Sequence, residues 1–110
     1  MKAFIYCRTT DRNATAIKAQ KLACIGYCRR EGLAVEKVFL DVDAGVFTIG
    51  HGLRGLIRAC RGAGCDVRHL VLYPTVDSAW VIRKLADAVM TMPAIAADSS
   101  SSTNARRTDD

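Results

Sequence analysis

The order of apolar segments constrains the fold of this chain most strongly, because blocks of strand length alternate with blocks of helical periodicity. The predicted strands are residues 2–7, 33–40 and 67–73. Apolar residues recur at steps of three and four, as in amphipathic helices, over residues 14–30, 53–61 and 78–90. Strands joined through helices make right-handed crossovers, so this order predicts an α/β fold with a parallel sheet.

The last part of the chain differs from the rest in composition. Beyond Met92-Pro93 the sequence is rich in alanine, serine and charged residues and has no apolar periodicity. Such a segment offers too little apolar surface to bury. The 110 residues suffice for one small core. We therefore expect one domain over residues 1–92 and a disordered polar tail over residues 93–110.

The excess of positive charge favours an anionic partner such as DNA. The chain carries 16 lysines and arginines against 11 aspartates and glutamates, a formal net charge of +5. Most of the cations are arginines, whose planar guanidinium matches phosphate oxygens. Arg54, Arg58 and Arg61 form a stripe on the outer face of the second predicted helix and are the candidate DNA-binding residues. A solvated face of an amphipathic helix would show the same pattern.

The cysteines and the hydropathy predict a cytoplasmic protein. The chain has five cysteines, an odd number, and no cationic and apolar leader precedes them, which favours reduced thiols. Cys24 and Cys28 lie one helical turn apart, and without a second pair or a nearby histidine they indicate core packing rather than a metal site. No apolar run approaches the ~20 residues of a membrane span, so we expect no membrane association. Neither a metal nor a small-molecule cofactor is predicted.

The end of the first predicted strand has the features of a site. The strand stops at Arg8, and Thr9 and Thr10 follow it directly. Open α/β sheets bind ligands at the carboxyl ends of their strands, so Arg8 would supply a fixed cation there and Thr10 an oxygen nucleophile. The alternative is a helix cap, for which Thr10, Asp11 and Asn13 all offer a side-chain oxygen.

The segment Tyr6-Cys7-Arg8-Thr9-Thr10 resembles the start of serine recombinases of the resolvase/invertase type. In that family the strand ends Tyr-x-Arg-x-Ser, and the serine attacks a DNA phosphodiester. Further similar segments follow in the family's order: Gln20, Asp41 with Ala44-Gly45, Gly50-His51-Gly52-Leu53, and residues 71–80. The resemblance implies a three-layer, resolvase-like (flavodoxin-like) α/β domain that is incomplete, together with DNA as a partner and a homodimer.

The resemblance also implies which residues would act in catalysis. Thr10 stands at the nucleophile position, and Arg8 and Asp77 match two further catalytic positions. Three expected arginines are replaced, by Gly50, Ser78 and Val81. Arg83 is a poor substitute, because two residues along a helix turn a side chain by about 200°.

Losing one charge-stabilising donor typically costs ~100-fold in rate, so three losses predict a catalytically impaired relative, such as a remnant from a mobile element. The alternative is an active DNA strand-exchange recombinase that uses Thr10 as its nucleophile.

Two other enzyme or signalling classes begin with a similar strand, and the spacing argues against both. A receiver-like domain with Asp41 or Asp43 as phosphoacceptor needs an acidic pair after the first strand, where this chain has Arg8-Thr9-Thr10. A small cysteine phosphatase needs an arginine six residues after its cysteine, and the residue six after Cys7 is Asn13. The two histidines, His51 and His69, are isolated and indicate packing or surface roles.

Overall fold

The computed structural model describes residues 1–10, 12–43, 45, 47–62, 64–75, 78–88 and 94–96. Strands and helices alternate along the chain, as the sequence predicts. The elements are β1 (Lys2–Arg8), α1 (Ala14–Arg30), β2 (Ala34–Asp41), α2 (His51–Arg61), β3 (His69–Leu72), α3 (Ser78–Ala88) and β4 (Ala94–Ala96). The predicted α/β class is confirmed.

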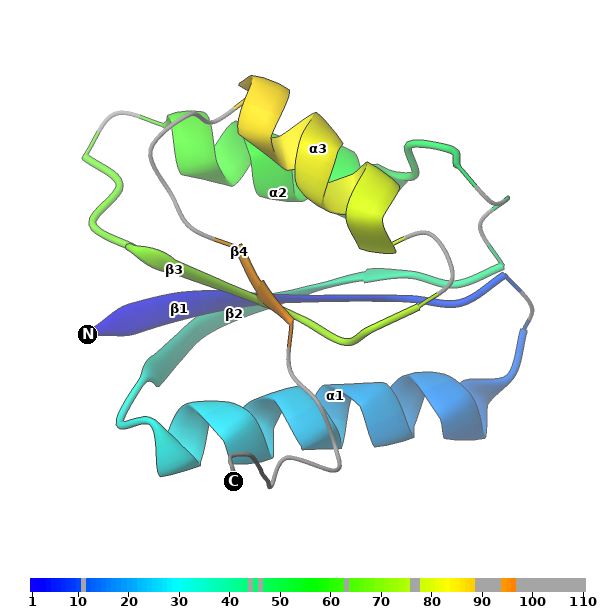
Figure 1. The fold of residues 1–110 in the computed structure, drawn as a ribbon, viewed down its shortest axis with the longest axis horizontal. Coiled ribbons are helices and arrows are strands. Elements are labelled where there is room, and N and C mark those ends of the chain that lie inside the picture. The colour runs from blue at the N-terminus through cyan, green and yellow to red at the C-terminus, as the bar shows by residue number, and fades with distance from the viewer. Residues whose placement is uncertain are drawn as a thin grey trace, which may run out of the picture.

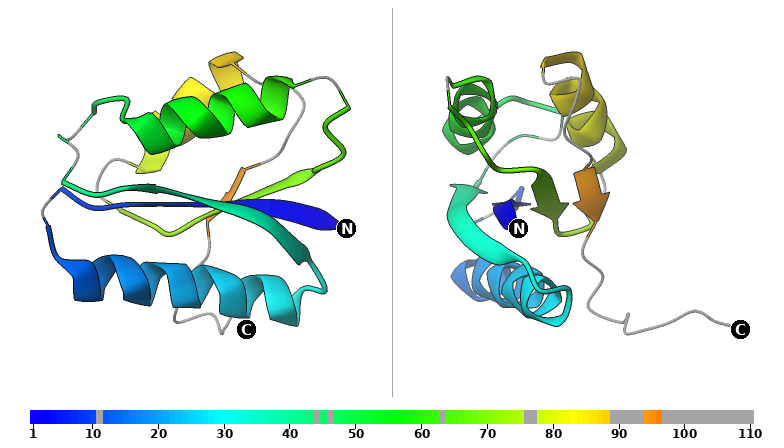
Figure 2. Two further views of the ribbon diagram at one scale, coloured as in Figure 1. Left: turned by 180° about the vertical axis from the view of Figure 1, so that it is seen from behind. Right: turned by 90° about the vertical axis from the view of Figure 1, so that its left-hand side faces the viewer.

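A parallel sheet forms the middle layer of the molecule. Its strands lie in the order β2-β1-β3-β4, and each neighbouring pair is parallel. Helix α1 covers one face, and α2 and α3 lie side by side on the other (Figures 1 and 2). The three-layer arrangement predicted from the sequence is therefore present. Because the strands are parallel, the segments that follow them meet at one edge of the sheet.

The central strand β1 is buried on both faces, which explains its continuous apolar sequence. Phe4 and Tyr6 point to the core beneath α2 and α3. Ile5 and Cys7 point to the core beneath α1, where Cys24 and Cys28 also lie. Cys24 and Cys28 are 0% and 1% exposed, so the prediction that they pack in the core is confirmed.

The sheet extends further along the chain than the sequence indicated. Strand β4 pairs with β3 through Leu70 and Ala94, Val71 and Ile95, and Leu72 and Ala96. These three residues of β4 fall inside the segment 93–110 for which a disordered tail was predicted, so that prediction is wrong for 94–96. Residues 97–110 lie outside the described residues, and disorder there stays a prediction.

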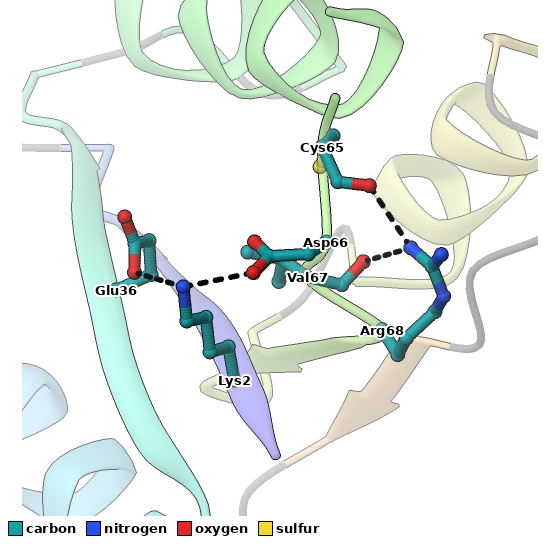
Figure 3. Close-up of polar contacts among 6 residues, drawn as sticks. All are labelled: Lys2, Glu36, Cys65, Asp66, Val67 and Arg68. Atoms are coloured by element: carbon teal, nitrogen blue, oxygen red, sulfur yellow. Dashed lines mark hydrogen bonds and ion pairs between the residues drawn. The ribbon is translucent and has the colours of Figure 1, made fainter. Parts of the chain in front are cut away.

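Charged side chains connect the amino ends of three neighbouring segments. The ammonium of Lys2 on β1 lies 2.9 Å from a carboxylate oxygen of Asp66 and 3.7 Å from Glu36 on β2 (Figure 3). Hydrogen bonding and charge attraction from Asp66 raise the pKa of Lys2. All three side chains are largely exposed, so the cluster adds little to stability. It lies at the end of the sheet opposite to the candidate site.

Candidate functional site

The carboxyl ends of β1 and β2 bring Arg8 and Asp41 together. The two residues are direct partners in the register of these strands, at the last position of each. A cavity of about 10 Å³, roughly the room for one water molecule, lies beside Arg8. The residues that line it are Tyr6, Arg8, Leu72, Tyr73, Thr75, Ser78 and Val81. The cavity is therefore formed by β1, by β3 and the residues that follow it, and by the start of α3.

Asp41 supplies the amino end of α2 with its hydrogen-bond acceptors. One carboxylate oxygen accepts from the backbone amide of Gly52 at 2.7 Å, and the other accepts from Leu53 at 2.8 Å. The negative charge of a carboxylate at this position also interacts favourably with the positive end of the helix dipole. The Tyr6 hydroxyl donates to the same carboxylate at 2.5 Å. Burial, and then this hydrogen bond, raise the pKa of Tyr6, so its hydroxyl stays protonated.

The guanidinium of Arg8 is buried and holds the segment that connects β2 to α2. Its Nη2 donates to the carbonyl oxygens of Gly45 at 3.0 Å and Thr48 at 2.9 Å. Its Nη1 donates to the Tyr6 hydroxyl at 3.0 Å. Arg8 is 3% exposed, and its Cζ lies 5.8 Å from the ring centroid of Trp80. In this conformation the guanidinium stabilises the protein's own backbone rather than facing an external phosphate.

Thr10 is exposed and is not one of the residues that line the cavity. The helix-cap alternative for Thr10 is wrong, because Asn13 caps α1. The Asn13 side chain accepts a hydrogen bond from the amide of Ala16 at 2.9 Å. Because Asn13 caps the helix, the hydroxyl of Thr10 is left for contact with solvent or a ligand.

Gln20 connects α1 to the end of β1, since its Nε2 donates to the Arg8 carbonyl at 3.1 Å.

The structure has no room for arginines at two of the three positions where the family has them. A Cβ added to Gly50 would collide with the Asp41 carboxylate. Val81 is 2% exposed and belongs to the apolar core beneath α2 and α3. At the third position, the Ser78 hydroxyl accepts from the amide of Thr75 at 2.5 Å. Arg8 is the one arginine among the described residues that line the cavity.

Two further residues named by the sequence resemblance have different outcomes. Asp77 lies outside the described residues, and its catalytic role stays a prediction. Arg83 is exposed whereas Val81 is buried, which agrees with the expected turn away from the site.

Among the described residues, no group of three or more histidine, cysteine, aspartate or glutamate side chains is arranged to hold a metal ion. None of the helices, over their described residues, is long and apolar enough to span a membrane.

The basic stripe of α2 lies along a groove. Arg54, Arg58 and Arg61 are exposed, and together with Ile57 and Gly62 they line a volume of about 460 Å³. The helix itself contains no acidic residue between His51 and Arg61. The charge of this surface is therefore not balanced within α2.

An aromatic pair beside the site was not recognised in the sequence as functional. Phe47 and Trp80 contact each other edge to face, with ring centroids 6.0 Å apart and an interplanar angle of 66°. The ammonium of Lys84 lies 5.6 Å from the centroid of Trp80. The only sequence signal was a phenylalanine in a glycine-containing segment between two elements, and such a residue is usually assigned to the core.

The fold defines the class of protein that this chain resembles: it has the fold of a serine recombinase catalytic domain. The crystal structure of the C-terminal catalytic domain of ISC1926 TnpA, an IS607-like serine recombinase, is similar with a TM-score of 0.70. The match covers 87% of this chain and 68% of that chain, at 19% sequence identity. No protein-family model matches the sequence. No curated protein sequence matches it either.

Proposed function

We propose that this chain is a divergent serine-recombinase-like domain that associates with DNA and is impaired in strand cleavage. The observation that carries the proposal is the placement of Arg8. The guanidinium at the position where the family needs a phosphate-binding cation is 3% exposed and donates to Gly45, Thr48 and Tyr6. A phosphodiester would have to displace these acceptors before it reached the cation.

Impairment also follows from the surroundings of Arg8. Attack on phosphorus builds negative charge on the non-bridging oxygens, which preorganised cations must stabilise. The cavity beside Arg8 has a volume of about 10 Å³, too small for a phosphate group. Gly50 and Val81 occupy positions where an added guanidinium would collide with Asp41 or enter the core. An exposed hydroxyl at Thr10 is then a nucleophile without the charges that activate it.

Association with DNA is supported by the groove on α2. Its three arginines are exposed and lie at successive turns of one helix face, so they can meet a phosphate backbone without a change in fold. Contacts of this kind do not depend on base sequence. We therefore expect binding to duplex DNA that is weak in specificity and strongly dependent on salt.

Salt-dependent binding to a duplex oligonucleotide tests this association. The variant Arg54→Gln/Arg58→Gln/Arg61→Gln should weaken binding at low salt and reduce the slope of log K against log salt by about 2 to 3. The matched control is Lys18→Gln/Lys21→Gln/Arg29→Gln, which removes the same charge from exposed positions of α1 on the other face of the sheet. Absence of binding at low salt, or equal losses for the two variants, would contradict the proposal.

A further inference from the structure

We propose that Phe47 and Trp80 form a stacking site for an unpaired nucleobase, so that single-stranded nucleic acid binds at the carboxyl end of the sheet. This inference rests on the proposed association with DNA and names the part of the nucleic acid that the candidate site takes. Phe47 precedes α2, and Trp80 lies in the first turn of α3. Arg8 lies beside this pair, because its Cζ is 5.8 Å from the centroid of Trp80, which contacts Phe47.

Phe47 is presented to solvent in an unusual way. The residue is 57% exposed although it is a large aromatic side chain. Its backbone φ of 59° lies in the left-handed region, which is unfavourable for a bulky residue. Backbone strain of this kind persists only where the surroundings impose it, and it is concentrated at binding and catalytic sites.

The contacts of Arg8 impose this conformation. Its guanidinium donates to the carbonyl oxygens of Gly45 and Thr48, which flank Phe47 on either side in the chain. The Thr48 hydroxyl also donates to the Gly45 carbonyl at 2.5 Å. The buried Arg8 guanidinium thus fixes the short segment between Gly45 and Thr48, which carries the exposed ring of Phe47. The hydrogen bonds of Arg8 to Gly45 and Thr48 therefore have a role in this account: they hold the Phe47 ring in its exposed position.

The charges around the pair favour a nucleotide over an apolar partner. The ammonium of Lys84 lies 5.6 Å from the Trp80 centroid and, unlike the buried Arg8 guanidinium, belongs to a side chain that reaches solvent. Proteins that bind single strands combine aromatic rings, on which bases stack, with cations that follow the phosphates. In a duplex the base faces are covered by their neighbours. Only an unpaired base can therefore stack on Phe47.

Tryptophan fluorescence provides a direct test, because Trp80 is the only tryptophan in the chain. The probes are a thymidine oligonucleotide, its duplex with a deoxyadenosine oligonucleotide, and inorganic polyphosphate, which has charge without bases. We expect the single strand to quench Trp80 and to bind about tenfold more tightly than the duplex. Equal affinity for single strand and duplex, or equal quenching by polyphosphate, would overturn the inference while leaving duplex association intact. Absence of binding to all three probes would overturn both proposals.

Variants of Phe47 separate stacking from general effects on the loop. Phe47→Ala should reduce single-strand affinity about tenfold and leave duplex affinity unchanged, whereas Phe47→Tyr should retain both. Leu22→Ala is the matched control, because Leu22 is equally exposed at 57% and lies on α1, on the other face of the sheet. An equal loss of single-strand and duplex affinity in Phe47→Ala would contradict the stacking role. So would a smaller sedimentation coefficient for Phe47→Ala than for the wild-type chain, which would identify the pair as a contact between copies of the chain.

Discussion

The Tyr6 hydroxyl and the Asp41 carboxylate form a buried hydrogen bond of 2.5 Å across β1 and β2. This hydrogen bond connects the helix cap at α2 with the hydrogen bonds of Arg8. The carboxylate caps the amino end of α2, and the hydroxyl accepts from Arg8. The same group of side chains therefore positions the Arg8 guanidinium and caps the amino end of α2.

Removal of the Tyr6 hydroxyl should destabilise the domain. Tyr6→Phe keeps the buried ring but leaves Asp41 and Arg8 each without one partner, and a buried hydrogen bond to a charged group contributes about 1.5 to 3 kcal/mol. Urea unfolding should show a loss of this size. Tyr27→Phe is the control, because the Tyr27 side chain is only partly buried on α1; a similar loss in both variants would contradict the network.

Arg8 and Arg12 should differ in their contribution to stability, although both contact the segment between β2 and α2. Arg8→Ala removes the guanidinium donor from the carbonyls of Gly45 and Thr48 and from the Tyr6 hydroxyl, so we expect a loss of about 2 to 4 kcal/mol. Arg12 pairs with Asp43 at 2.9 Å but its side chain is 87% exposed, so Arg12→Ala should cost less than about 1 kcal/mol.

Thermal or urea unfolding of the two variants measures this difference. Trp80 fluorescence should also change in Arg8→Ala, because the guanidinium lies near the ring. If both variants had the same small effect, the structural role assigned to Arg8 would be wrong.

Much of the fold could be predicted from the sequence, because apolar periodicity reports burial directly. The continuous apolar run of β1 indicated a strand covered on both faces, and α1 was predicted within its observed bounds. Strand β4 was missed because its three residues, Ala94–Ala96, are too few for any periodic signal and depend on β3 for their pairing. Short strands of this kind are defined by tertiary contacts rather than by local pattern.

The candidate site was predictable in its location and not in its contacts. The end of β1 was identified from Arg8 and the threonines that follow it. Several oxygens could cap α1, and only the backbone geometry selects Asn13 over Thr10. The bonds from Arg8 to Gly45 and Thr48 join residues far apart in sequence, and no local pattern encodes them.

Two glycines should respond in opposite directions to substitution by alanine. Gly50→Ala places a Cβ against the Asp41 carboxylate, and relief of such a collision typically costs about 1 to 3 kcal/mol. Gly26 lies inside α1, where an added Cβ would meet only the flexible end of Arg30 at 3.7 Å. Gly26→Ala should therefore stabilise the domain by about 0.5 to 1 kcal/mol. Calorimetric midpoints that moved in the same direction for both variants would contradict the packing described around Asp41.

Stability should fall at alkaline pH. Burial raises the pKa of Cys60 from 9.0 to about 11, and burial with the bond to Asp41 raises that of Tyr6 above 10.0. Because the folded state retains protons that the unfolded chain releases, the free energy of unfolding decreases as the pH rises from about 9 towards 11. A hydrogen bond between the thiols of Cys7 and Cys24 lowers the pKa of Cys7 and raises the pKa of Cys24. The effects of these two thiols on the pH dependence of stability therefore have opposite signs.

Urea unfolding at pH values across this range, with a reductant present, measures the slope. Cys60→Ala should make the slope shallower. Stability that stayed constant or increased with pH would contradict the assigned burial of these groups.

Trapping of a covalent protein–DNA adduct tests the proposed impairment most directly, because strand cleavage through Thr10 would require attack of its hydroxyl on phosphorus. The wild-type chain, Thr10→Ser and Thr10→Ala would each be incubated with a pool of duplex DNA, and adducts detected on denaturing gels and by mass spectrometry. With Arg8 bound to the protein's own carbonyls, we expect no adduct from any of the three, including the serine variant. A wild-type adduct that disappears in Thr10→Ala would contradict the account.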